Sequence, residues 1–168
     1  LEHISFPDAT FKTDKIIEIQ PVGSNDMNIV WEWRMIDHII QDYDDTKANY
    51  GVVADHPELI DINFNNGEAF NFCHVNAIDY NPVLDQILIS ARNLSEIYII
   101  DHSTSTIEAS GHTGGNFNKG GDILWRWGNP QIYRQGNVFV ICTQCGTYIR
   151  NSYAWLKIKF FTFHELLN

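Results

Sequence analysis

The chain has 168 residues, of which 44% are hydrophobic and 19% charged, and this balance excludes a disordered chain, a collagen and a coiled coil. The formal net charge of −10 argues against binding to bare nucleic acid or to an anionic membrane surface. No run approaches the roughly 18 consecutive apolar residues that a membrane-spanning helix needs. No leader segment is visible before the first predicted strand, and the many aromatic, glycine and proline residues indicate a β-rich fold.

Two strands are predicted first, over Lys15–Ile19 and Asn28–Trp33, with a turn at Pro21–Asp26 between them. A long polar stretch follows over Asp37–Asn71, and a short helix is predicted at its beginning, over Ile36–Tyr43. A loop of that length inside a compact domain is usually functional or disordered. Its mixture of aromatic and acidic residues favours an ordered loop.

Four further strands are predicted in close succession, over Val75–Tyr80, Gln86–Ala91, Glu96–Asp101 and Asp122–Trp127. Short turns separate the first three, and the glycine-rich loop Gly111–Gly121 precedes the fourth. Four successive antiparallel strands make one blade of a β-propeller. We therefore expect an all-β propeller fragment with one near-complete four-stranded blade, part of another blade and a long insertion loop. A small β-sandwich of about seven strands is the alternative.

The composition changes near Gly136. Residues 1–136 carry a net charge of −12, whereas residues 137–168 carry +2 and hold Cys142 and Cys145, two of the three cysteines. This change predicts two parts: a partial β-propeller over residues 1–136 and a tail of different character over residues 137–168. The Cys142-x-x-Cys145 pair stands alone in this tail, and such a lone pair supports neither a zinc site nor a redox motif.

An anion site is predicted where His74 and Asn76 begin one strand and Arg92 ends the next. In an antiparallel pair with a short turn, the start of the first strand lies beside the end of the second. The guanidinium fork of Arg92 matches the oxygens of sulfate or phosphate. The alternative is that His74 and Arg92 are ordinary surface residues. His38, in the long loop, joins this pocket or pairs with a nearby Asp.

Other motifs carry weaker signals. The histidines of the chain lack the spacing of a zinc site, among them His38, His56, His74, His102 and His112. Neither a metal nor a cofactor is therefore expected. The segment Gly115–Gly120 lacks the Lys and Ser/Thr of a phosphate-binding loop.

The chain also contains two pairs of tryptophans at a spacing of two residues, Trp31 with Trp33 and Trp125 with Trp127. On strands, such pairs are more often packed in the core than used as a platform for sugars. A lectin-like use of these rings stays open as the alternative.

Several segments together resemble the bacterial aryl-sulfate sulfotransferases, over about residues 15–136. They are residues 74–80 (His-Val-Asn-Ala-Ile-Asp-Tyr), 89–101, 125–130 (Trp-Arg-Trp-Gly-Asn-Pro), 31–33 (Trp-Glu-Trp), 37–38 and 42–44. The resemblance implies a six-bladed propeller that moves a sulfuryl group from an aryl sulfate to a phenol through a sulfated histidine, with no nucleotide donor and no cofactor. It also implies a periplasmic or extracellular location, with a homodimer as one candidate assembly.

The resemblance implies roles for four residues. His74 and Asn76 match the His-x-Asn pair of the family, and Arg92 matches its sulfate-contacting arginine. His38 matches an additional histidine of the pocket. His74, Arg92 and His38 are thus the expected catalytic residues, and Asn76 is expected to bind substrate.

The chain departs from the family at the nucleophile. The family places its nucleophilic histidine shortly after the Trp-Gly-Asn-Pro segment, but here residues 141–146 read Ile-Cys-Thr-Gln-Cys-Gly, and the next histidine is His164. Codons for residues 142–145 can be chosen so that a one-base shift reads Ala-His-Asn, which suggests that the tail is translated out of frame. As written, the chain is expected to lack activity. The alternative function is a non-catalytic propeller module that binds an anion or a glycan.

Overall fold

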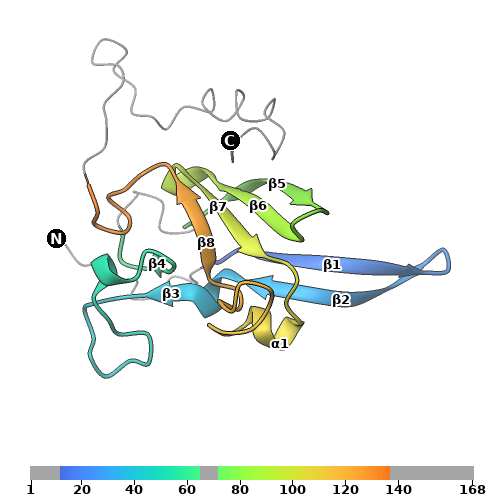
Figure 1. The fold of residues 1–168 in the computed structure, drawn as a ribbon, viewed down its shortest axis with the longest axis horizontal. Helices are drawn as coiled ribbons and strands as arrows, with labels where there is room; N and C mark the ends of the chain where they lie inside the picture. The colour runs from blue at the N-terminus through green and yellow to red at the C-terminus, as the bar shows by residue number, and fades with distance from the viewer. Residues whose placement is uncertain (1–11, 65–71, 137–168) are drawn as a thin grey trace, which may run out of the picture.

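The computed structural model describes residues 12–64 and 72–136, which form strands with very little helix (Figure 1). The predicted all-β class is confirmed for these residues. The tail over residues 137–168, with Cys142 and Cys145, lies outside the described residues, and so does the end of the predicted long loop.

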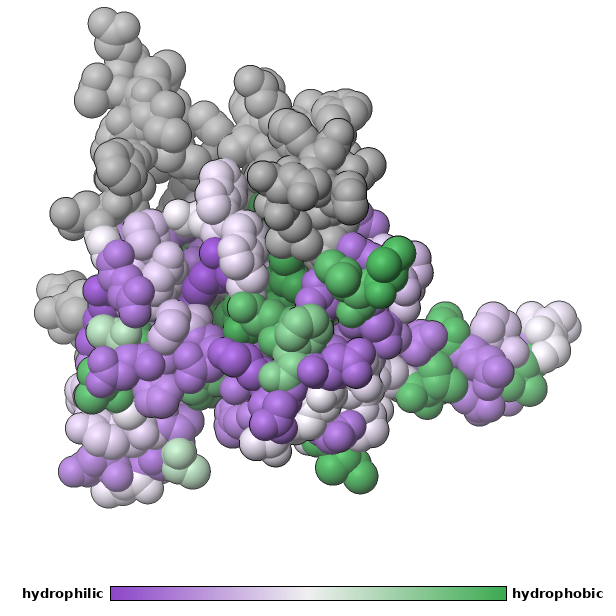
Figure 2. Space-filling model, viewed as in Figure 1, coloured by the Kyte–Doolittle hydropathy of each residue, from purple (hydrophilic) through white to green (hydrophobic). Residues whose placement is uncertain are grey.

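The described chain begins with a hairpin of β1 (Lys15–Val22) and β2 (Asp26–Arg34). Both predicted strands are confirmed, and each is longer than expected. Gly23 has a φ of 61° in the turn, a left-handed conformation that glycine adopts without a steric cost. The outer half of the hairpin extends beyond the rest of the fold (Figures 1 and 2) and exposes a set of apolar side chains: Ile19, Val22, Met27 and Ile29.

After β2 the chain forms a single turn of 3-10 helix, η1 (Met35–His38), and the short strand β3 (Ile39–Ile40). β3 pairs in parallel with β4 (Ile60–Asp61), and the connection between them contains η2 (Val53–Asp55). The helix predicted over Ile36–Tyr43 is therefore present only as η1, up to His38, and the prediction is wrong for the residues that follow. The two β-branched isoleucines of β3 favour extended backbone, and the Ile40 carbonyl accepts a hydrogen bond at 3.0 Å from the N–H of Ile62.

The second half of the described chain forms a four-stranded antiparallel sheet, which confirms the four predicted strands. Its strands follow one another in the order of the sequence: β5 (Val75–Asn81), β6 (Gln86–Ala91), β7 (Glu96–Asp101) and β8 (Ile123–Trp127). Such a sheet is what one propeller blade contains, while the closed propeller stays a prediction.

Two short helices lie in the connections of this sheet, η3 (Arg92–Leu94) after β6 and α1 (Thr106–Ala109) after β7. Ser105 caps α1 in a capping box with Glu108. No helix among residues 12–64 and 72–136 is long and apolar enough to cross a membrane.

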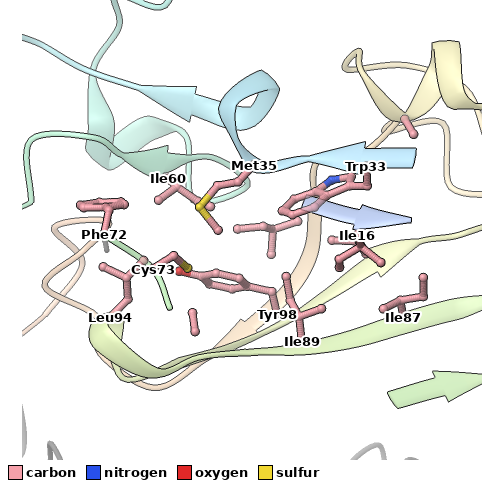
Figure 3. Close-up of a cluster of buried hydrophobic side chains, with 14 of the residues drawn as sticks. Ile16, Trp33, Met35, Ile60, Phe72, Cys73, Ile87, Ile89, Leu94 and Tyr98 are labelled. Carbon is pink, nitrogen blue, oxygen red and sulfur yellow. The ribbon is translucent and has the colours of Figure 1, made fainter. Parts of the chain in front are cut away.

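One face of the four-stranded sheet packs against the hairpin and η1 to form the main core. Figure 3 shows Trp33 and Met35 facing Tyr98 and Ile89 across the space between the two layers. A second, smaller cluster lies on the other face of the sheet and comprises Leu88, Ile97 and Ile99. This division follows from the strand geometry, because successive side chains of a strand point to opposite faces.

The two tryptophan pairs have different environments. Trp31 and Trp33 are 4% and 0% exposed and belong to the main core, as predicted. Trp125 and Trp127 are 36% and 53% exposed, so the prediction of core packing is wrong for this pair. The reason is the position of β8, which has a neighbouring strand on one side only within the described sheet. Arg126, between these tryptophans, points into the protein instead.

Candidate functional site

The structure brings the backbones of His74 and Arg92 together at one end of the four-stranded sheet. Val75 pairs with Ala91 in the ladder between β5 and β6. The N–H of Arg92 donates a hydrogen bond at 3.2 Å to the carbonyl of His74. These contacts give the arrangement that the antiparallel connection between the two strands predicts.

The backbone at this end of the sheet is irregular. His74 has a φ of 50°, a left-handed conformation that is uncommon for residues other than glycine and tends to occur at functional sites. The ladder shifts its register between Val75 and Ala77, so Asn76 is the extra residue of a β-bulge. A bulge re-aims a side chain, and bulges are frequent beside active sites. His74 is half-buried and Asn76 is exposed.

The guanidinium of Arg92 is exposed, and no described residue forms an ion pair or a hydrogen bond with it. Its backbone is held by η3, which closes with a hydrogen bond at 3.1 Å from the N–H of Ser95 to the Arg92 carbonyl. An arginine held in this way offers its planar donor fork to an anion. Imidazole, amide and guanidinium groups thus extend from three neighbouring backbone positions.

The thiol beneath this site is chemically inert. Cys73 is fully buried next to His74, and burial raises the pKa of its thiol well above the usual range. Because the thiolate is the nucleophilic form of cysteine, Cys73 fills the core rather than reacting. Its carbonyl accepts a hydrogen bond at 3.0 Å from the N–H of Asn93, which further ties β5 to the segment after β6.

A buried polar network lies at the same end of the sheet, and sequence reasoning missed it. Arg126 donates through Nε to Oε1 of Glu96 at 3.0 Å and through Nη2 to Oε2 of the same carboxylate. The Tyr98 hydroxyl donates to Glu96 Oε2 at 2.6 Å. Burial raises the pKa of Glu96, and it raises the pKa of Tyr98 well above the usual range.

Arg126 also connects this network to the loop before β4. Its Nη1 donates to the carbonyls of Pro57 and Leu59 at 2.8 and 2.9 Å, and its guanidinium lies 4.3 Å from the ring centroid of Tyr133. The sequence carries one signal of this: in Trp125-Arg126-Trp127 the alternation places Arg126 on the face opposite to both tryptophans. We conclude that the network supports the end of the sheet that presents Arg92.

His38 is not brought together with His74, Asn76 and Arg92. Its ring is fully buried beside Asp122, which immediately precedes β8. Because Ile123 at the start of β8 pairs with Ile100, and Trp127 at its end pairs with Ile97, Asp122 lies at the far end of the sheet. His38 therefore occupies the end opposite to Arg92.

The geometry described above defines a class of protein: a β-sheet protein with a candidate anion site at one end of its four-stranded sheet. The chain belongs to the arylsulfotransferase (ASST) family, because the family model Arylsulfotransferase (ASST) matches residues 7–136. This match confirms the resemblance found in the sequence and includes all four predicted site residues. Comparison with curated proteins and comparison with solved structures each find no significant match.

Proposed function

We propose that this chain is part of an aryl-sulfate sulfotransferase and that His74, Asn76 and Arg92 hold the sulfuryl group of an aryl sulfate. The observation that supports this most directly is their position on irregular backbone at one sheet end, with the Arg92 guanidinium unpaired among the described residues. Membership of the arylsulfotransferase family supplies the substrate class. The small-molecule partners are an aryl sulfate and a phenol.

The proposed reaction has two balanced steps. A histidine nitrogen attacks sulfur, an S–N bond forms, and the S–O bond to the donor phenolate breaks. The oxygen of an acceptor phenol then attacks sulfur, the S–N bond breaks, and the phenol proton passes to the released histidine nitrogen and from there to solvent. The Arg92 guanidinium and the His74 imidazole would stabilise the negative charge that spreads over the sulfuryl oxygens in both steps.

His38 is placed outside the sulfate contacts in this proposal. Its Nδ1 lies 2.8 Å from Asp122 Oδ1 and its Nε2 lies 2.9 Å from the Ala109 carbonyl, so neither ring nitrogen faces open space. The sulfated histidine itself matches none of the described residues, because the family places it after the Trp-Gly-Asn-Pro segment. We propose that the chain as written binds aryl sulfates without turning them over, outside the cytoplasm.

The binding part of the proposal is tested by calorimetry with 4-nitrophenyl sulfate, comparing the full chain with R92A. A charge-assisted hydrogen bond contributes about 1.5–3 kcal/mol, so we expect R92A to bind at least about tenfold more weakly. K47A removes the same charge from an exposed lysine in another loop and should bind like the unmodified chain. Equal binding by R92A and the unmodified chain would contradict the proposed site.

The catalytic part is tested by following release of nitrophenol and by mass spectrometry of the protein. We expect no release above background and no sulfated protein. A sulfated form of the chain would show that a nucleophile is present after all, and mapping its position would identify the residue.

The origin of the tail is tested by sequencing the DNA that encodes residues 129–168. If the tail is translated out of frame, a one-base correction restores a frame with a histidine shortly after Asn129 and Pro130. A confirmed reading frame would contradict this explanation and leave a chain with a divergent tail.

A second candidate function, a non-catalytic module that binds a glycan, is favoured by the exposed rings of β8. Trp125 lines a largely apolar hollow with Ile99, Phe117 and Leu124. Aromatic faces of this kind can stack on a sugar ring as well as on a phenyl group. Glycan binding that W125A abolishes and R92A retains would favour this candidate over the sulfotransferase.

A further inference from the structure

Two histidines and an aspartate converge at the sheet end opposite to Arg92, although no sequence motif links them. The Nδ1 atoms of His38 and His112 each lie 2.8 Å from the same oxygen, Oδ1 of Asp122. The three side-chain atoms all lie within 4.8 Å of one another. The residues come from η1, from the loop after α1 and from the position before β8, so the tertiary fold alone assembles them.

The hydrogen bonds of His38 leave one of its ring nitrogens facing an acceptor. Its Nε2 lies 2.9 Å from the carbonyl of Ala109, which can only accept, so this nitrogen carries the hydrogen. Its Nδ1 then points a lone pair at Asp122 Oδ1, which in a carboxylate is also an acceptor. Two acceptors at 2.8 Å need a bridging proton or a bound cation between them.

The His38 ring is held rigidly in this orientation. It stacks on Trp33 with the ring centroids 5.4 Å apart and an interplanar angle of 2°. Trp33 donates through Nε1 to the carbonyl of Gly121 at 2.7 Å. Residue 121 has to be glycine, because an added Cβ would lie 2.1 Å from the Ala109 carbonyl oxygen and 2.6 Å from His38 Nε2.

This environment is the one that metal-binding histidines have in proteins. A ligating imidazole almost always donates its other N–H to a backbone carbonyl or a carboxylate, which fixes the tautomer and the ring orientation. Ala109 provides that carbonyl for His38. Two imidazole nitrogens and one carboxylate oxygen form a ligand set that suits Zn²⁺ and the related transition-metal ions.

We propose that His38, His112 and Asp122 bind a divalent cation of the Zn²⁺ class. Bond lengths of about 2.0–2.1 Å in a tetrahedral site place ligand atoms about 3.3 Å apart, so the ligands must separate slightly from the distances given above. The His112 side chain is 59% exposed and can adjust freely. His38 and Asp122 are buried 2.8 Å apart, so their ligand atoms must move apart by about 0.5 Å when the cation binds. The cation would join η1, the loop after α1 and β8, with its fourth position open to solvent beside His112.

The site is independent of sulfate binding, since it lies at the other end of the sheet. The proposal differs from the expectation drawn from histidine spacing, which considered only local motifs. A cation that binds only the folded chain stabilises the folded state by mass action. The site would therefore have a structural role and no catalytic one.

The test uses the full chain after treatment with a chelator, titrated with ZnSO₄ by calorimetry and with CoCl₂ by absorption. We expect one equivalent of Zn²⁺ to bind and the unfolding temperature to rise. H112A, which changes an exposed side chain, should fold normally and bind Zn²⁺ at least about tenfold more weakly, because it lacks one of three ligands. H56A is the matched control, since the half-exposed His56 ring pairs with Glu58 and belongs to another loop.

Absence of Zn²⁺ binding, or equal binding by H112A and the unmodified chain, would overturn the proposal. The Co²⁺ spectrum distinguishes ligands: nitrogen and oxygen ligation gives no thiolate charge-transfer band. A thiolate band would show that cysteines bind the metal, and it would overturn the assignment as well. Normal 4-nitrophenyl sulfate binding by H112A would keep this result separate from the proposed function.

Discussion

Replacing Arg126 with methionine is expected to lower the free energy of unfolding by about 3–5 kcal/mol, the usual cost of breaking a buried ion pair by removing one partner. Glu96 is fully buried and Arg126 nearly so. The substitution leaves the Glu96 carboxylate without its cation, and it also leaves the carbonyls of Pro57 and Leu59 without their donor. Methionine keeps much of the side-chain volume, so the loss reports on the polar contacts.

The measurement is urea unfolding of R126M at neutral and at mildly acidic pH. Burial already raises the pKa of Glu96, and loss of Arg126 raises it further, so the folded variant takes up a proton more readily than the unfolded chain does. The deficit in stability should therefore be largest at neutral pH and shrink as the pH falls. K15M, which breaks the exposed pair of Lys15 with Glu32, should change stability little. Equal losses in R126M and K15M would contradict the prediction.

Replacing Trp33 with alanine is expected to cost about 3–5 kcal/mol as well, through lost burial and the cavity that remains. Trp33 is completely buried in the main core between the hairpin and the four-stranded sheet (Figure 3). The substitution also removes the hydrogen bond to the Gly121 carbonyl and the ring stacked on His38. Three contacts of one side chain are lost together, which makes this position sensitive.

Thermal and urea unfolding in the presence of a chelator measure the effect of W33A without a contribution from bound metal. W127A is the matched control, because the Trp127 ring is about half exposed on the edge strand. We expect W127A to lose much less stability than W33A. A similar loss in both variants would mean that the two tryptophans contribute equally to the core, against the burial seen in the structure.

Local patterns predicted most of the strands because alternation and turn residues act over short distances. The strands β5 to β8 each pair with a neighbour in sequence, so a local reading of the chain also gives their order. The helix expected over Ile36–Tyr43 is limited to η1, because the two isoleucines of β3 pair with distant β4. Pairing of that kind is invisible in a local window.

The candidate site likewise has parts that local patterns predict and parts that they do not. His74 and Arg92 could be predicted as neighbours because a single short turn joins their strands. The positions of Trp125 and Trp127 could not, since a strand pattern does not say whether the strand lies at the edge of its sheet. The convergence of His38 with His112 depends on the packing of η1 against the loop after α1, and no local spacing encodes it.

The order of the four-stranded sheet has a consequence for how the chain is made. β6, β7 and β8 each pair with the strand synthesised just before them, so each pairing joins neighbours in sequence and costs little chain entropy. The hairpin of β1 and β2, which this sheet packs against, is made earlier still. The four described strands can therefore assemble one by one on the ribosome as each emerges.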